Sequence, residues 1–121
     1  MFYGWVVNIF VDMYNKIYDF CKVRNFGNIY KNDTSQPPPR VEFLLNLLSE
    51  EEIEYELDRF DSNSGWSGKD CIGYNIILKG DSTKMVVAHH DVNNHKIDNA
   101  NDNSASVINA IMIKKLKPEM N

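Results

Sequence analysis

His89, His90 and Asp91 follow a short apolar run at residues 85–88. In open α/β sheets, functional side chains gather beyond the carboxyl ends of the strands. His89 stands at such an end, and Asp91, two residues on, shares its side of an extended chain, whereas His90 points to the other side. A zinc-bound imidazole usually donates its second N–H to a carboxylate, which fixes the ring tautomer. The spacing therefore suits a zinc ligand at His89 that Asp91 orients, and a purely structural histidine at the strand end is the alternative.

Asp102 directly precedes an apolar segment with helical spacing. Asp is a favoured N-cap residue, which is a sufficient structural reason for its presence. A carboxylate there also faces the positive end of the helix dipole, so it stays ionised and can bridge two cations. Two zinc ions about 3.5–4 Å apart recur in hydrolases. We therefore predict that His89 and Asp102 are metal ligands within reach of one another, with Asp91 hydrogen-bonded behind His89.

Two elements must position these residues, a strand over residues 84–89 and a helix over residues 104–116. The strand shows almost no alternation, which is typical of burial on both faces in the middle of an α/β sheet. A buried strand followed by a crossover helix normally continues into another strand. Because only five residues follow Leu116, we expect the front part of a larger α/β domain, truncated after the helix that follows the third strand.

Three regions precede that strand. Residues 1–24 are predicted to form an amphipathic helix, and residues 25–40, with three consecutive prolines, a linker that cannot sustain a helix or a central strand. Residues 41–121 are the expected domain portion. It opens with a helix over 41–49, a half-exposed strand over 53–60 and a second strand over 71–78, and a turn at 80–82 leads to the third strand.

Composition excludes several classes of protein. The chain has 121 residues and a net charge of -4, from 13 Lys and Arg against 17 Asp and Glu, so it lacks the basic footprint of a nucleic-acid binder. Its first apolar run is too short to cross a bilayer and has no cleavage site of a secretory signal, so we expect a cytoplasmic protein without a transmembrane segment. Cys21 and Cys71 are too few for a disulfide scaffold.

Residues 86–91, Val-Val-Ala-His-His-Asp, and residues 100–106, Ala-Asn-Asp-Asn-Ser-Ala-Ser, together resemble the di-zinc aminopeptidases of metallopeptidase family twenty-eight in clan MH. The resemblance covers about residues 40–116, the N-terminal portion of that family's domain. It implies a three-layer α/β zinc-peptidase fold with a sheet between flanking helices. It also implies that His89 is the first zinc ligand, that Asp91 supports it, and that Asp102 bridges two zinc ions.

The sequence departs from the family pattern at several positions. Asn99 stands where the family usually has Gly, and Ala105-Ser106 replace the usual Ser-Gly. The family also carries an adjacent Glu-Glu pair after the next strand, one a general base and the other a ligand. No such pair follows Leu116, so the general base is not present in this chain.

The expected function is zinc-dependent aminopeptidase chemistry, the metal-assisted hydrolysis of a peptide substrate, with this chain alone incomplete and inactive. A non-catalytic metal-binding or interaction fragment is one alternative, and a fragment of a glutaminyl-cyclase-like acyl transferase is another. An incidental metal site formed by His89, His90 and His95 on a loop is a further alternative. We further expect self-association through exposed apolar surface, because the last helix and the apolar strand lack a cover in this chain.

Overall fold

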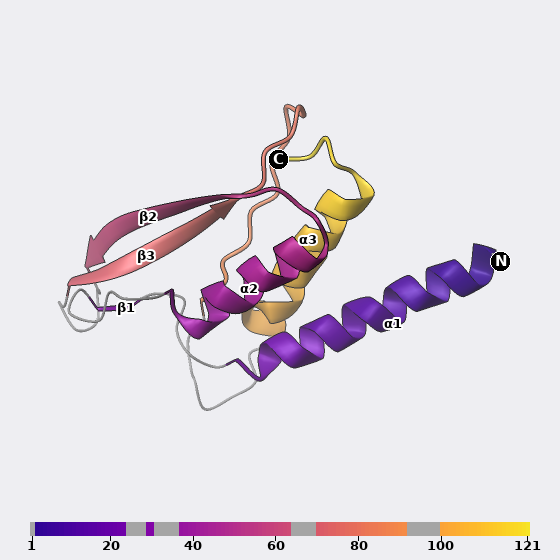
Figure 1. Cartoon of the computed structure of the whole chain (residues 1–121), viewed down its shortest axis with the longest axis horizontal. Coiled ribbons are helices and arrows are strands. Elements are labelled where there is room, and N and C mark those ends of the chain that lie inside the picture. Colours follow the sequence, from indigo (N-terminus) through magenta and orange to yellow (C-terminus); the bar gives the residue numbers. More distant parts are fainter. Residues whose placement is uncertain (1, 24–28, 31–36, 64–69, 92–99) are drawn as a thin grey trace.

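The computed structural model describes residues 2–23, 29–30, 37–63, 70–91 and 100–121. In chain order the elements are α1 (Phe2–Cys21), β1 (Ile29–Tyr30), α2 (Pro39–Glu50), β2 (Glu56–Asn63), β3 (Asp70–Ile77), the irregular turn η1 (Ala100–Ser104) and α3 (Ala105–Leu116). Figure 1 shows a small sheet on one side of α2 and the other two helices on the opposite side. Helices and a sheet are therefore combined in one unit, as the sequence predicts at that level.

The sheet is antiparallel, with β3 between β1 and β2. The strands β2 and β3 pair over their full lengths, from Glu56 opposite Ile77 to Asn63 opposite Asp70. Phe60 lies opposite Gly73, and its ring occupies the space that a Cβ at Gly73 would need. An aromatic ring over a cross-strand glycine covers backbone that would otherwise face water.

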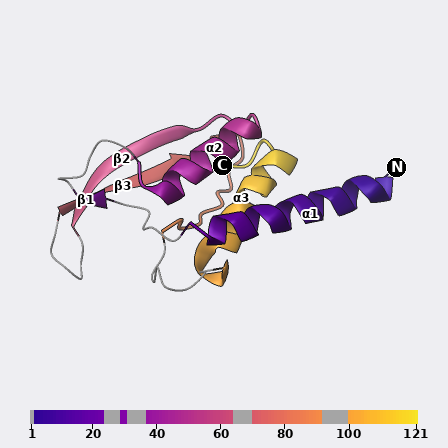
Figure 2. The same ribbon diagram turned by 60° about the horizontal axis from the view of Figure 1, so that its bottom comes forward.

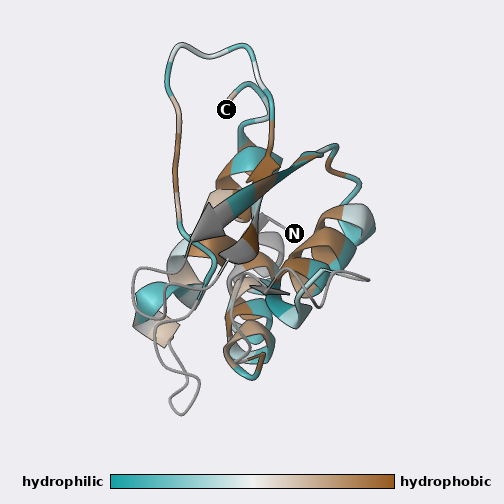
Figure 3. Cartoon of the chain, turned by 90° about the vertical axis from the view of Figure 1, so that its left-hand side faces the viewer, coloured by the Kyte–Doolittle hydropathy of each residue, from teal (hydrophilic) through white to brown (hydrophobic). Residues whose placement is uncertain are grey.

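One core joins the three helices, and a smaller one joins α2 to the sheet. The first contains Phe20, Leu44, Leu47, Leu48, Val107, Ile108, Ile111 and Met112, and the second contains Val41, Ile72 and Tyr74. The helices carry hydrophobic and hydrophilic residues in alternating patches, as amphipathic helices do (Figure 3). Helix α2 is therefore the central layer, with one side on β3 and the other on α1 and α3.

The N-terminal helix has the predicted character. It buries Phe20 and Cys21 and rests Ile9, Met13 and Ile17 partly on the core, while Val11, Tyr14 and Tyr18 stay exposed. Its N-terminal half extends away from the rest of the protein in both views (Figures 1 and 2). Within the described ranges, no helix combines the length and apolar character that crossing a membrane requires.

The predicted linker holds two described pieces of regular structure. Ile29–Tyr30 forms the short edge strand β1 on β3, and α2 begins at Pro39, two residues earlier than expected. Proline at the first helical position has no N–H to leave unpaired, so the last proline of the run starts the helix. Residues 24–28 and 31–36 of the linker lie outside the described part of the chain.

The expected third strand over residues 84–89 is wrong. This segment has no regular secondary structure, and the sheet contains no strand beside it in the described part of the chain. Met85 and Val87 are 73% and 82% exposed, so burial on both faces is wrong as well. A strand exists only through its neighbours' hydrogen bonds. Among the described residues, the one backbone–backbone bond of residues 85–88 joins the Val86 N–H to the Asn121 carbonyl.

Candidate functional site

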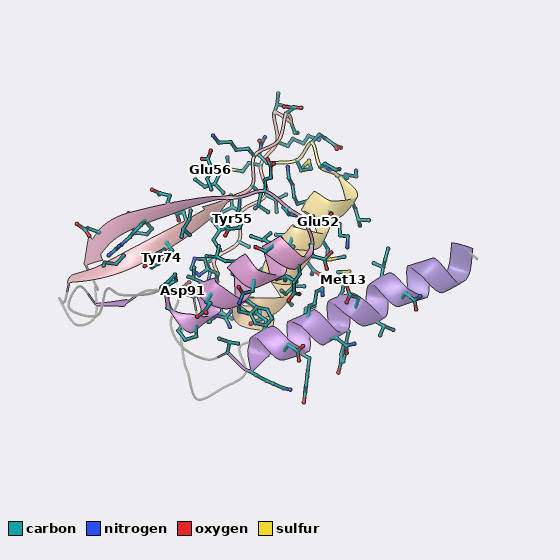
Figure 4. The ribbon with its side chains drawn as sticks, viewed as in Figure 1. Met13, Glu52, Tyr55, Glu56, Tyr74 and Asp91 are labelled. Atoms are coloured by element: carbon teal, nitrogen blue, oxygen red, sulfur yellow. The ribbon has the colours of Figure 1, made fainter. Side chains whose placement is uncertain are left out.

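The first half of the site is the end of the apolar segment. The His89 Nδ1 atom lies 3.0 Å from the Asp91 Oδ1 atom, so the carboxylate two residues on does reach back to the ring. His90 faces the opposite side, as predicted, and its Nε2 donates to the Tyr74 carbonyl at 2.8 Å. Figure 4 shows Asp91 beside the first turn of α2, between the sheet and α1.

The second half comes from the turn before α3. The Asp102 Oδ1 atom lies 3.1 Å from the His89 Nε2 atom, which is the predicted approach. The backbone bends at Asp102 and Asn103, which have non-helical angles and are joined by a cis peptide bond. Asp102 is not the N-cap of α3, because the helix begins at Ala105 with Ser104 as its N-cap. The capping explanation of Asp102 is therefore wrong, and its carboxylate is directed at His89 instead.

His89 thus has a carboxylate on each ring nitrogen. Ionised carboxylates only accept hydrogen bonds, and a neutral imidazole has only one N–H to donate. In the neutral ring one nitrogen lone pair would face a carboxylate oxygen at about 3 Å. The arrangement consequently calls for positive charge on the ring or for a cation between one nitrogen and its carboxylate.

Zinc fits this donor pair on the His89 Nε2 side. Zinc binds imidazole nitrogen and carboxylate oxygen at about 2.0–2.2 Å, so two ligands of one tetrahedral ion lie about 3.3 Å apart. The 3.1 Å between His89 Nε2 and Asp102 Oδ1 is close to that separation. Asp91 on Nδ1 then stands where the orienting carboxylate of a zinc-bound histidine belongs. His89, Asp91 and Asp102 are 56%, 61% and 65% exposed, so the site is open to solvent.

The described residues hold no group of three or more His, Cys, Asp or Glu side chains suited to a metal ion. His95 and Asn99, which the sequence analysis singled out, lie outside the described ranges. The described site therefore consists of two candidate ligands and one orienting carboxylate.

Sequence reasoning missed two residues that hold the halves of the site together. Asn103 donates from Nδ2 to the His89 carbonyl at 3.1 Å. Arg40, the second residue of α2, is fully buried, and it donates from Nε to the His90 carbonyl at 2.6 Å and from Nη2 to the Ser104 hydroxyl at 3.1 Å. The sequence signal that could have identified Arg40 was its position, because it precedes Leu44 by one helical turn and therefore lies on the apolar side of α2.

A separate apolar groove lies on the other side of the segment that ends in His89. It encloses about 580 Å³ between residues 85–88, β3 and α3, and it is lined mainly by aliphatic side chains. His90 lines it, but His89, Asp91 and Asp102 do not. The groove is therefore distinct from the candidate site.

In comparisons with protein-family models, with curated proteins and with solved structures, the chain has no match. The assignment of function consequently depends on the residues and their geometry.

Proposed function

We propose that this chain is a zinc-binding α/β unit of the di-zinc aminopeptidase kind, in which His89 and Asp102 are zinc ligands and Asp91 orients His89. The observation that carries the proposal is the imidazole between two carboxylates, at 3.0 and 3.1 Å. The two short motifs around these residues resemble that family in the same order along the chain. The three-layer fold of the family is part of the same proposal.

The proposed chemistry is hydrolysis of a peptide bond. Bound zinc would supply Lewis acidity toward a carbonyl oxygen and toward water. His89, Asp91 and Asp102 would hold the metal and fix the imidazole, but no general base can be assigned among the described residues. Without such a base, about 10²–10⁴ in rate is lost.

We therefore expect weak zinc binding and no turnover from the 121 residues alone. Catalytic zinc sites use at least three protein ligands, and the described part of this site offers two. Zinc titration by calorimetry should give a dissociation constant well above micromolar, and this constant should rise further in His89→Ala. Cleavage of aminoacyl-nitroanilides should equal that of the His89→Ala control. Sub-micromolar binding with His89-dependent turnover would contradict this expectation and would mean that other side chains complete the site.

The second candidate is a non-catalytic unit in which His89 is an imidazolium ion-paired to both carboxylates. The geometry favours it, because an imidazolium donates one N–H to each of the two carboxylates without any metal. Zinc titration of the wild-type protein and of Asp102→Asn separates the two candidate functions. If zinc is bound, the substitution removes a ligand and abolishes His89-dependent binding. If the pair is only ionic, the wild-type protein shows no His89-dependent zinc binding at all.

A further inference from the structure

Arg40 is a charged residue in the centre of the fold. Its side chain is fully buried, and its guanidinium lies over the Phe20 ring with 3.8 Å between the Cζ atom and the ring centroid. To other described residues it donates four hydrogen bonds, all to uncharged oxygens. Among the described residues it forms no ion pair with a carboxylate.

Burying such a charge carries a large desolvation cost. Desolvation lowers the pKa of Arg40 to about 10, which still leaves the group charged at neutral pH. An apolar side chain of similar volume often serves packing equally well or better. The hydrogen bonds of Arg40, rather than its volume, therefore account for an arginine at this position.

Those bonds join three segments that are distant in sequence. From Nη1, Arg40 donates to the Phe20 carbonyl at 3.2 Å and to the Val23 carbonyl at 2.8 Å, at the end of α1. From Nε it reaches the carbonyl of His90, the residue after His89. From Nη2 it reaches the hydroxyl of Ser104, two residues after Asp102.

We propose that Arg40 is the positioning residue of the site, whose planar guanidinium fixes the segment of His89 against the turn of Asp102. This deepens the proposed function and rests on it only in treating the His89–Asp102 pair as the functional site. A guanidinium has five N–H groups in a rigid fork, and four of them are used here in fixed directions. A lysine at position 40 offers one nitrogen and cannot reach all three segments.

The test compares full-length variants without metal, by the ¹⁵N signals of the His89 ring. His89→Gln assigns the signals, and Asp102→Asn defines the position of the Nε2 signal when the pair is lost. Arg40→Met should move that signal at least half of the way to the Asp102→Asn position, and Arg40→Lys should move it less. Leu44→Ala is the control, because it opens the same core one turn along α2 without touching these hydrogen bonds.

Ser104→Ala removes only the bond from Arg40 to the α3 side, so it carries the test if Arg40→Met does not fold. It should shift the Nε2 signal in the same direction by a smaller amount. An unmoved signal in folded Arg40→Met or, failing that variant, in Ser104→Ala would overturn the proposal, and so would an equal shift in Leu44→Ala.

A zinc titration then separates this proposal from the proposed function. Supporting residues of metal sites are worth about 10–100-fold in affinity, and we expect a loss of that size in Arg40→Met. If the wild-type protein binds no zinc while the ring signals behave as expected, the metal assignment fails and the positioning role stands.

Discussion

Asp91 is the residue whose role can be isolated most cleanly. Asp91→Asn keeps the shape of the side chain but removes the charge beside His89 Nδ1. We expect zinc affinity to fall about 10–100-fold. The free energy of unfolding should change by less than about 0.5 kcal/mol, because the side chain is exposed.

Calorimetric zinc titration and chemical denaturation measure the two quantities. Asp81→Asn, at an exposed aspartate in the turn before residues 84–89, is the matched control. If both variants lose affinity equally, the effect comes from net charge and Asp91 has no orienting role.

The proximity of His89, Asp91 and Asp102 was predicted from a strand over residues 84–89 that does not form, so only the spacing of His89 and Asp91 and the position of Asp102 just before α3 supported it. Arg40 was not predictable as a site residue. Its partners are the carbonyls of Phe20, Val23 and His90 and one hydroxyl. A carbonyl is present at every position, so a hydrogen bond to one leaves no trace in the sequence. Only the structure shows which carbonyls converge on the buried guanidinium.

Among the elements, the three helices are tied together by Glu51, which follows the last residue of α2. Its carboxylate pairs with Lys115 of α3 and lies 3.5 Å from Lys16 of α1. The hydrogen bond from Lys115 is the main reason that the pKa of Glu51 is lowered, with Lys16 adding to it. A lowered carboxyl pKa stabilises the folded state in full above the unfolded pKa, and this contribution is lost as the pH falls through the folded value.

Glu51→Gln should therefore cost about 1 kcal/mol at pH 7, a modest value because Lys115 is half exposed. The difference from wild type should shrink as the pH falls below the ordinary glutamate pKa of 4.5, because the wild-type carboxylate then becomes protonated. Urea denaturation across this range measures it. Glu42→Gln, at an exposed glutamate of the same helix, should show no such difference. A constant gap between Glu51→Gln and wild type down to pH 3 would contradict the assignment.

The helices were predictable from apolar spacing, and β2 and β3 from alternation and turn residues. The conformation of residues 84–89 was not predictable, because a continuous apolar run indicates only that the segment prefers burial. Whether it becomes a strand depends on a neighbour that supplies hydrogen bonds. In the described structure only Asn121 contributes one, so the run stays irregular and largely exposed.

At the scale of the whole molecule, that exposure has a consequence for association. Met85, Val86 and Val87 form an apolar ridge of residues 85–87 at the rim of the groove. Exposed apolar surface of this kind favours association in water. We expect concentration-dependent self-association of the chain, reduced by Val87→Lys with a change in unfolding free energy below about 0.5 kcal/mol.

Analytical ultracentrifugation over a range of concentrations tests this. Val11→Lys is the control, because it places the same change at an exposed valine on α1. A wild-type protein that stays monomeric at all concentrations would contradict the expectation, and an equal effect of the two substitutions would place the association elsewhere.

The exposure of the three site residues has a further meaning for evolution. His89, Asp91 and Asp102 lie on the surface, so replacing any of them costs the fold little. Selection for folding alone would therefore let these three residues drift. Joint retention of His89, Asp91 and Asp102 among natural variants would therefore record selection on the site itself.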